Sequence, residues 1–335
     1  MDNFKELISD YTKKINRSLS NFLESQANSV NYSDNKSPDS LFVPLNYIMS
    51  GGGKRIRPLL LLLSCDACGG NVDLALDAAV AIEILHNFTL VHDDIMDNAL
   101  TRRGKETIHT RWSVNTAILV GDELIGLSYR SILNTKTNKI SQIIKTFTDG
   151  VIEVCEGQAL DNQFEKDDKI SLNDYFFMIQ KKTAELLSSA AVIGALIANA
   201  SDKIIDVIRS YSKNLGLAFQ IQDDLFDVIA NESQFGKKIG GDIIEKKKTY
   251  LFLKSLEKSS GDNKENIIKM YFSEKNENKI ENIIKIYKQL GVIEDAKNDI
   301  NLYTRKAGDS LSNKLDYDAI SKLLCFADLL LNRGY

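Results

Sequence analysis

The chain has 335 residues, of which 43% are hydrophobic and 26% are charged, values typical of a globular protein. Its formal net charge of −4 does not support nucleic-acid binding, so an anionic ligand would need a local basic cluster. The first residues, MDNFKELISDY, are charged and lack an apolar signal core, so we expect a cytoplasmic protein. The uncharged stretch 186–201 is shorter than the roughly 20 residues that span a bilayer, and we predict no transmembrane segment.

Apolar spacing predicts helices along most of the chain. In the first segment Phe4, Leu7 and Tyr11 recur at helical intervals, and the polar stretch 27–40 then predicts a loop. All three prolines lie within the first 58 residues, so long helices are permitted afterwards. GDNKEN (261–266) and SEKNENK (273–279) are typical of exposed turns. Further helices, some of them broken, are predicted near 42–49, 57–68, 73–98, 114–133, 138–161, 173–199, 203–231, 245–257, 263–290 and 293–331.

Because no segment alternates as a strand does and no linker divides the chain, we predict an all-α fold with a single domain over residues 1–335. The four cysteines do not change this interpretation. Cys65 and Cys68 have the spacing of a metal or redox site, but no second CxxC or Cys/His pair accompanies them. Buried free thiols in a reducing compartment are therefore favoured over a metal site.

Two clusters of aspartates interrupt apolar segments, in HDDIMD (92–97) and QDDLFD (222–227). Residues four apart share a helix face, so each cluster places carboxylates side by side. The clusters comprise Asp93, Asp94 and Asp97, then Asp223, Asp224 and Asp227, with Gln220 one turn before the second. An exposed acidic patch near a helix end is the simpler alternative, but two such clusters inside apolar helices favour a cation site. Carboxylates repel one another unless a cation neutralises them, and oxygen ligands without His or Cys favour Mg²⁺.

Three basic segments could hold an anion beside these carboxylates. They are GGGKRIRP (51–58), TRRGK (101–105) and FGKKIGGDIIEKKKT (235–249). The first lacks the spacing of a nucleotide P-loop. The other two each follow an aspartate cluster closely, an arrangement suited to a metal with a diphosphate. Within the last segment we expect Lys246 and Lys248 to lie on a solvated face.

These motifs resemble those of the trans-isoprenyl diphosphate synthases, which condense an allylic diphosphate with isopentenyl diphosphate. The resemblance covers residues 40–250 and is weaker at both ends. The motifs GGGKRxRP, His86, DDxxD, RRG, EGQALD (156–161), KKT, FQIQDD and GKxxGxDxxExKxT occur in the family's order. The resemblance implies the isoprenoid synthase fold, in which long helices surround a central apolar cavity.

The resemblance also implies roles for individual residues. Isopentenyl diphosphate would be held by Lys54, Arg57, His86 and Arg103. The allylic diphosphate would be held by Arg102, Lys182 and Lys247, with Lys237 or Lys238 completing the set. About three Mg²⁺ ions would bind mainly to Asp93, Asp97 and Asp223, with Asp94, Asp224 and Asp227 as ligands or water-bridged supports. The polar groups lining the developing carbocation would be Thr183 and Gln220.

The family's reaction gives these residue types a physical purpose. Mg²⁺, Lys and Arg neutralise the charge that grows on the departing diphosphate. The alkene of isopentenyl diphosphate, held close by its own basic pocket, then attacks the carbocation. Water must be excluded or the cation is quenched, which accounts for apolar segments around the aspartates.

Product length is expected to depend on the helix before the first cluster. Phe88 lies five residues before Asp93, about 7.5 Å along an ideal helix, where a bulky residue resembles the pattern of archaeal-type geranylgeranyl diphosphate synthases. Thr89 points closer to the aspartate face on an ideal helix, and Phe88 could instead be a core aromatic. If Phe88 is a tunnel floor, replacing it with alanine lengthens the products.

Several alternatives stay open at this point. The product could be farnesyl or a longer prenyl diphosphate, and the chain could be a non-catalytic partner subunit or a terpene cyclase. A partner subunit usually lacks one aspartate motif, and a cyclase would lack the isopentenyl diphosphate site. The family is typically homodimeric, and an apolar helix such as 114–133 could form the interface.

Overall fold

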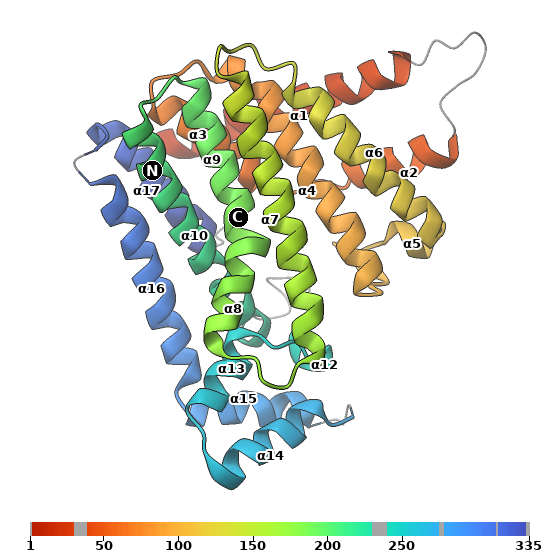
Figure 1. Cartoon of the computed structure of the whole chain (residues 1–335), viewed down its shortest axis with the longest axis vertical. Coiled ribbons are helices and arrows are strands. Elements are labelled where there is room, and N and C mark those ends of the chain that lie inside the picture. The colour runs from red at the N-terminus through yellow and green to blue at the C-terminus, as the bar shows by residue number, and fades with distance from the viewer. Residues whose placement is uncertain (1, 30–38, 230–239, 275–277, 313, 333–335) are drawn as a thin grey trace. The chain divides into compact units, whose positions relative to one another are not determined.

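The computed structural model describes residues 2–29, 39–229, 240–274, 278–312 and 314–332 (Figure 1). The chain divides into two compact units that are each built from separate stretches of sequence. Unit 1 comprises Met1–Val151, Leu187–Arg209 and Leu311–Phe326, and unit 2 comprises Ile152–Leu186, Ser210–Ser310 and Ala327–Tyr335. The single domain expected from the sequence therefore stays a prediction.

The described residues are almost entirely helical, which confirms the all-α prediction. The first helices are α1 (Asp2–Ser29), α2 (Asp39–Met49), α3 (Ile56–Ala67), α4 (Leu76–Met96), α5 (Ile108–Arg111), α6 (Val114–Ile132), α7 (Ile140–Lys166) and α8 (Leu172–Ile179). They are followed by α9 (Glu185–Ile197), α10 (Asp202–Ile229), α12 (Gly241–Ile244), α13 (Tyr250–Glu257), α14 (Gly261–Phe272), α15 (Lys279–Gln289), α16 (Val292–Leu311) and α17 (Tyr317–Asn332).

Three short elements interrupt this pattern. A 3₁₀ turn, η1 (Val72–Ala75), leads into α4, and a π-helical turn, η2 (Gln180–Ala184), joins α8 to α9. The TRRGK segment forms a two-stranded antiparallel hairpin, β1 (Thr101–Arg102) with β2 (Lys105–Glu106). This hairpin was not predicted, because two residues per strand are too few to show alternation.

The ends of the helices were predicted less accurately than their presence. GDNKEN was expected to be a turn, but it forms the start of α14, where Asp262 lies in the first turn and suits the positive end of the helix dipole. Ile267 and Tyr271, four residues apart, bury one face of the same helix. The expected loop 27–40 is shorter than predicted, since α1 ends at Ser29 and α2 begins at Asp39. Residues 30–38 of that loop, and 275–277 of SEKNENK, lie outside the described residues.

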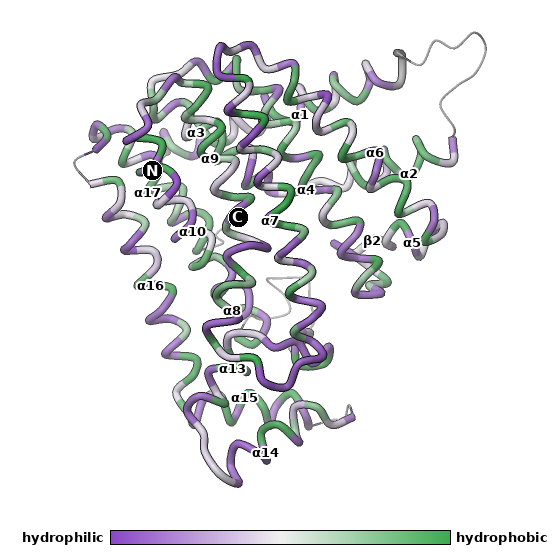
Figure 2. The backbone as a smooth tube through the Cα atoms, in the orientation of Figure 1, coloured by the Kyte–Doolittle hydropathy of each residue, from purple (hydrophilic) through white to green (hydrophobic). Residues whose placement is uncertain are grey.

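The core of unit 1 is formed around α4, which is buried on most of its circumference. Figure 2 colours the backbone of this helix by the hydropathy of its residues. The segment Val72–Met96 is long and apolar enough to cross a membrane, but 67% of its most apolar window is buried inside the fold, as in the core helix of a globular protein. On α6, a Cβ added at Gly121 would lie 2.1 Å from Nε2 of His92. Glycine at this position leaves room for the imidazole of His92, one residue before Asp93.

The core of unit 2 lies around the π turn η2. A Cβ added at Gly157 of α7 would lie 2.3 Å from the backbone nitrogen of Lys182, and one added at Gly216 of α10 would lie 2.6 Å from Cα of Ala184. Two helices therefore contact the π turn through glycines, with no side chain between the backbones. Single π turns of this kind occur mostly at functional sites.

The cysteines are all free thiols. Cys65 is buried, and burial raises its pKa to about 12, while Cys68 is half-buried. These two agree with the predicted buried thiols. Of the other two cysteines, Cys325 is half-buried and Cys155 is exposed on α7.

Candidate active site

The first aspartate motif lies at the carboxyl end of α4. Asp93 and Asp94 belong to the last turn, and Asp97 is the capping residue, with its N–H donating to the Asp93 carbonyl at 2.9 Å. The helix therefore ends earlier than the predicted residue 98. Asp94 is only 3% exposed, and burial raises the pKa of its carboxyl. Asp93 and Asp97 are half-exposed, so they are the members open to a ligand.

Arg102, predicted to bind the allylic diphosphate, lies beside this motif in unit 1. Its Nε donates to Oδ1 of Asp94 at 2.6 Å, and its Nη2 lies 3.6 Å from Oδ2 of Asp93. A diphosphate bound to Arg102 would thus lie next to the motif carboxylates. The turn that presents it is tight, because Arg103 and Gly104 both adopt positive φ, 52° and 74°.

The predicted isopentenyl diphosphate residues of unit 1 form a cationic cluster. Nη1 of Arg57 lies 3.3 Å from Nε2 of His86, and Nη1 of Arg103 donates to the Gly52 carbonyl at 2.5 Å. Burial lowers the pKa of Arg57 to about 10, and burial together with Arg57 holds the pKa of His86 well below its usual value. Nε of Arg57 is buried with no hydrogen-bond partner among the described residues. A desolvated cation with an unsatisfied donor suits an anionic ligand. Lys54, at the same turn, is exposed.

Arg55, between Lys54 and Arg57 in the sequence, has a different environment. Its backbone is left-handed (φ 52°), and its Nε donates to Oδ1 of Asn16 at 3.0 Å. The guanidinium also pairs with Glu83, and both side chains are buried. Arg55 is therefore neutralised inside the unit. The sequence could not reveal this, because Asn16 and Glu83 are distant along the chain.

The predicted chain-length residues lie one turn before the first motif. Phe88 is 6% exposed, and its ring meets the His92 ring edge-on with centroids 4.7 Å apart. Thr89 is half-buried, and its hydroxyl donates to the His86 carbonyl at 2.8 Å. Phe88 therefore packs on the His92 side chain, which in turn fills the space left by Gly121.

One aromatic cluster near the hairpin was missed by the sequence analysis. The Tyr47 hydroxyl donates to the Glu106 carbonyl at 2.9 Å, so α2 anchors strand β2. The Arg111 guanidinium lies 4.7 Å from the Tyr47 ring centroid and 5.0 Å from that of Trp112. Such cation–π contacts rigidify the segment that carries Arg102 and Arg103. No spacing signal could have identified them, since the residues come from three different elements.

The second aspartate motif lies on α10 in unit 2, and its members differ in exposure. Asp224 is 5% exposed and accepts hydrogen bonds from the Tyr175 hydroxyl (2.7 Å), the Tyr250 N–H (2.9 Å) and Nε2 of Gln220 (3.0 Å). Burial raises its pKa to about 6. Asp223, in contrast, is exposed. Asp224 thus supports the motif from within the core, and Asp223 is the carboxylate that a metal could reach.

Asp227 joins the motif to the next helix. Its two carboxylate oxygens accept hydrogen bonds from the N–H groups of Gly241 and Asp242, each at 3.1 Å, at the start of α12. Burial and then the Asp227 charge raise the pKa of Asp242 well above its ordinary value. A cation near Asp227 would relieve this repulsion.

The predicted catalytic residues of unit 2 lie together at the π turn. Nζ of Lys182 contacts Oδ2 of Asp161 at 2.6 Å, so the EGQALD segment supplies the counter-ion of this lysine. The Thr183 hydroxyl donates to Oε1 of Gln220 at 2.8 Å. Nζ of Lys247 lies 3.0 Å from Glu245. The remaining cation, Lys237, lies outside the described residues, as does Lys238.

Within the described residues no group of three His, Cys, Asp or Glu side chains forms a closed metal cage. Such a cage is not what Mg²⁺ requires, because this ion commonly takes one or two carboxylates and completes its shell with water and substrate phosphate. The accessible carboxylates Asp93, Asp97 and Asp223, all oxygen donors, fit that pattern.

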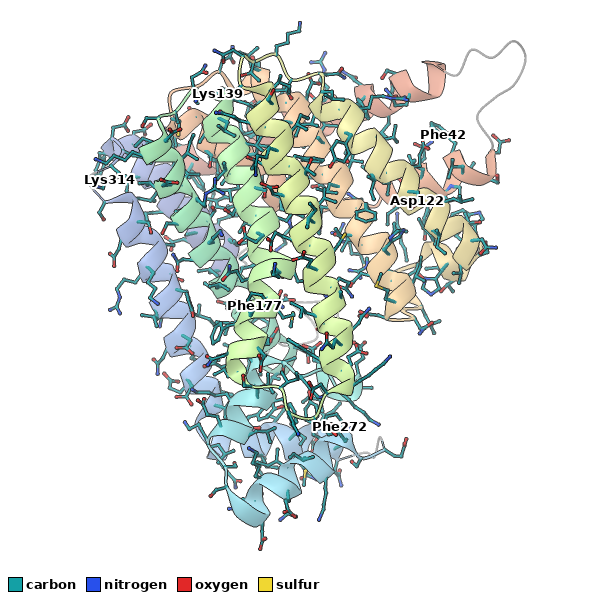
Figure 3. All side chains as sticks on the ribbon, viewed as in Figure 1. Phe42, Asp122, Lys139, Phe177, Phe272 and Lys314 are labelled. Carbon is teal, nitrogen blue, oxygen red and sulfur yellow. The ribbon has the colours of Figure 1, made fainter. Side chains whose placement is uncertain are left out.

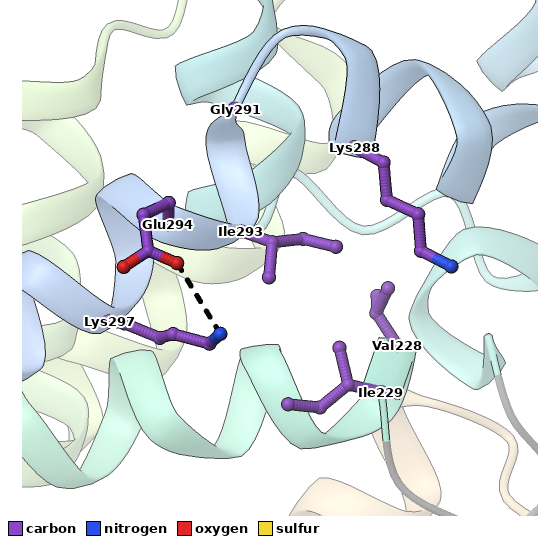
Figure 4. A pocket seen from close by; sticks show the side chains of 7 residues that line it. All are labelled: Val228, Ile229, Lys288, Gly291, Ile293, Glu294 and Lys297. Atoms are coloured by element: carbon purple, nitrogen blue, oxygen red, sulfur yellow. Dashed lines mark hydrogen bonds and ion pairs between the residues drawn. The ribbon is translucent and has the colours of Figure 1, made fainter.

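Unit 2 also has a shallow pocket of about 500 Å³, which begins at Val228, directly after Asp227 (Figure 4). Val228, Ile229 and Ile293 supply its apolar surface. Of its charged groups, Lys297 pairs with Glu294 at 3.4 Å. None of the predicted site residues that the structure describes lines this pocket, so it is separate from the aspartate motif.

A helical fold with two aspartate motifs and adjoining cations defines the chain as a member of a prenyltransferase class, and comparisons with known proteins identify the family. Residues 38–290 match the model of the polyprenyl synthetase family. The chain is 36% identical over 299 residues to a short chain isoprenyl diphosphate synthase of Methanothermobacter thermautotrophicus, which covers 89% of this chain and 92% of that protein. The chain therefore belongs to the polyprenyl synthetase family and is a prenyltransferase with the isoprenoid synthase fold.

Solved structures agree. The geranylgeranyl pyrophosphate synthetase of Pyrococcus horikoshii has a TM-score of 0.90 at 32% identity and covers 99% of each chain. The geranylgeranyl pyrophosphate synthase of Corynebacterium glutamicum, complexed with isoprenyl diphosphate and magnesium, has a TM-score of 0.87 at 25% identity, covering 96% of this chain and 98% of that one.

Proposed function

We propose that this protein is a Mg²⁺-dependent short-chain prenyl diphosphate synthase that adds isopentenyl diphosphate to an allylic diphosphate and yields mainly geranylgeranyl diphosphate. The observation that carries the proposal is the Arg57–His86 cluster, where the buried Nε–H of a half-buried guanidinium is unsatisfied beside a neutral imidazole. Such a cluster provides an anion site in addition to the two aspartate motifs. A terpene cyclase has no need for this second anion site.

The proposed roles are those that the family resemblance implies, and the environment of several groups supports them. Arg57, His86, Arg103 and Lys54 bind isopentenyl diphosphate, with His86 as a neutral hydrogen-bond partner rather than a cation. Arg102, Lys182 and Lys247 bind the allylic diphosphate. Asp93, Asp97 and Asp223 hold Mg²⁺, which when bound supplies positive charge to the departing diphosphate. Asp94, Asp224 and Asp227 accept hydrogen bonds from Arg102, the Tyr175 hydroxyl and the Gly241 N–H, which hold the two motif segments in place.

The polar groups at the π turn would stabilise the allylic carbocation. The Thr183 hydroxyl donates its proton to Oε1 of Gln220, so its lone pairs remain available as acceptors. The same hydrogen bond fixes the orientation of the Gln220 amide. Gln220 is also bound to the buried Asp224, so its position is determined from two sides. Preorganised dipoles of this kind stabilise charge without reorganisation during the reaction.

The proposed twenty-carbon product is supported by the buried Phe88 below Asp93 and by similarity to geranylgeranyl synthases. We further propose that the enzyme acts in the cytoplasm and as a homodimer.

The experiment that tests the function uses purified protein, Mg²⁺, labelled isopentenyl diphosphate and each allylic starter in turn. Products are dephosphorylated and sized by chromatography, and the reaction is repeated with Asp223→Asn. We expect a dominant twenty-carbon alcohol that requires Mg²⁺ and a turnover at least about 100-fold lower in the variant. Longer products would support the condensation reaction but contradict the hypothesis that Phe88 is the tunnel floor that limits chain length. Absence of condensation with every starter, despite Mg²⁺–diphosphate binding, would instead favour a non-catalytic partner subunit.

A further inference from the structure

The segment between α12 and α13 holds Lys247 in a constrained backbone. Lys246 adopts φ +60°, a left-handed conformation that is unfavourable for a side chain of its size. The Lys247 N–H donates to the Asp242 carbonyl at 3.0 Å, and the Lys247 carbonyl accepts from the Tyr271 hydroxyl at 2.6 Å. Strained residues persist only where the surrounding structure fixes them. A further restraint on this turn comes from the residue that follows Lys247.

Lys248 provides that restraint. Its side chain is only 6% exposed, and its ammonium donates to the carbonyls of Phe164 (2.8 Å), Glu165 (3.2 Å) and Asp167 (2.7 Å). The expectation that Lys248 lies on a solvated face is therefore wrong. The sequence could not show otherwise, because its partners lie about eighty residues earlier.

The carbonyls of Phe164 and Glu165 lie in the last turn of α7, and Asp167 directly follows the helix, so the ammonium lies where a helix end exposes backbone acceptors. A cation is favoured there by both hydrogen bonding and the helix dipole. The ammonium also lies 5.6 Å from the centroid of the Phe272 ring, a residue labelled in Figure 3. Among the described residues, the exposed Asp168, at 3.9 Å, is the carboxylate that forms an ion pair with this ammonium.

The α7 end carries a second residue of interest. Asp161, one turn before Phe164, contacts Nζ of Lys182 at 2.6 Å. Lys248 thus connects the turn that bears Lys247 with the helix end that orients Lys182. Both lysines belong to the set proposed for the allylic diphosphate.

We propose that Lys248 is a positioning residue that fixes Lys247 and the Asp161–Lys182 pair in the geometry needed to bind the allylic diphosphate. The inference rests on the proposed function and deepens it. It assigns a specific task to a lysine that does not itself contact substrate. Loss of the ammonium would release the turn at Lys246 and the last turn of α7 together, whereas the isopentenyl diphosphate residues in unit 1 would be unaffected.

The test compares Lys248→Met, which keeps the aliphatic stem, with Lys248→Arg, which restores donors to the carbonyls. Lys166→Met is the matched control, because Lys166 is an exposed cation at the same helix end. We expect Lys248→Met to raise KM for the allylic diphosphate at least about tenfold and to lower kcat, with KM for isopentenyl diphosphate changed by less than about twofold. Lys248→Arg should recover most of the loss, and Lys166→Met should match the wild type.

Three results would overturn the proposal. Lys248→Met could lower the melting temperature and leave both KM values unchanged, it could raise both KM values equally, or Lys166→Met could have the same effect. Two further measurements do not depend on turnover: calorimetric binding of inorganic diphosphate with Mg²⁺, and hydrogen exchange of the Lys247 amide. If the wild type lacks condensation activity, the proposed function fails. The positioning role is rejected as well if diphosphate binding and hydrogen exchange of the Lys247 amide are unchanged in Lys248→Met.

Discussion

The contact between α7 and the π turn makes a sharp prediction for Gly157→Ala. The new Cβ would lie 2.3 Å from N of Lys182, 2.5 Å from its Cα and 2.8 Å from C of Lys181. All three atoms belong to the backbone, so no side chain can rotate away to make room. An ordinary contact starts near 3.4 Å, and α7 and the turn must therefore separate by about 1 Å.

Two opposing effects set the magnitude. Overpacking of this kind costs about 1–3 kcal/mol, while replacing a helical glycine with alanine gains about 1 kcal/mol of helix propensity. We expect a net loss of up to about 2 kcal/mol in the free energy of unfolding. The effect on function should be larger, because Lys182 moves with the turn, and a displacement of about 1 Å can cost about 100-fold in activity.

Gly126→Ala is the matched control. Gly126 also lies inside a helix, α6, but no atom lies within 4 Å of an added Cβ. The same substitution should therefore stabilise the protein by up to about 1 kcal/mol and leave the kinetics unchanged. Urea unfolding followed by circular dichroism gives the stabilities, and steady-state kinetics with the allylic diphosphate varied give kcat/KM. Equal behaviour of the two variants would refute the close approach of Gly157 to Lys182.

Three further predictions concern unit 1. Phe88→Ala should shift the product towards longer chains because it removes the ring below Asp93, and chromatography that finds the wild-type length would reject the floor. Glu83→Ala should lower the free energy of unfolding by about 3–5 kcal/mol, since it leaves the Arg55 charge buried without its partner; a change in the urea midpoint no larger than that of an exposed substitution would contradict this. His86 has a folded-state pKa below its unfolded value, so the unfolded chain binds more protons and stability falls as the pH decreases below about 6.5, by at most about 1.4 kcal/mol per pH unit. Urea midpoints between about pH 7 and pH 5 should show a smaller pH dependence in His86→Asn than in the wild type, and equal dependences would exclude His86 as the cause.

The helices were predictable because apolar spacing and the distribution of proline are local properties of the sequence. The aspartate motifs were likewise visible as i, i+4 patterns. Spacing did not show which aspartates of a motif are buried and which are exposed. Asp224 is buried and accepts hydrogen bonds from the Tyr175 hydroxyl and the Tyr250 N–H, and both residues lie far away in the chain. Spacing alone does not separate Asp223 from Asp224, although the family resemblance implied Asp223 as a main ligand; the packing makes Asp224 a core residue.

The basic segments show the same limit. Spacing alone placed Lys54, Arg55 and Arg57 in one group, but the buried Glu83 neutralises Arg55, while Arg57 keeps an unsatisfied donor. The lysines of the run 246–248 likewise differ in their environments, because the Lys248 ammonium donates to a carbonyl of α7. Charge runs predict that cations are present, whereas long-range partners decide which cations can still bind an anion.

The stacking of Trp112 with Arg111 has a spectroscopic consequence. Trp112 is the only tryptophan of the chain, and it lies in unit 1 beside the β1–β2 hairpin. Selective excitation of indole fluorescence therefore reports on unit 1 alone, while circular dichroism reports on the helices of both units. If the two signals change at the same urea concentration, the units unfold as one cooperative body. If the two signals change at different urea concentrations, the fluorescence of Trp112 shows which of the two transitions belongs to unit 1, without any added label.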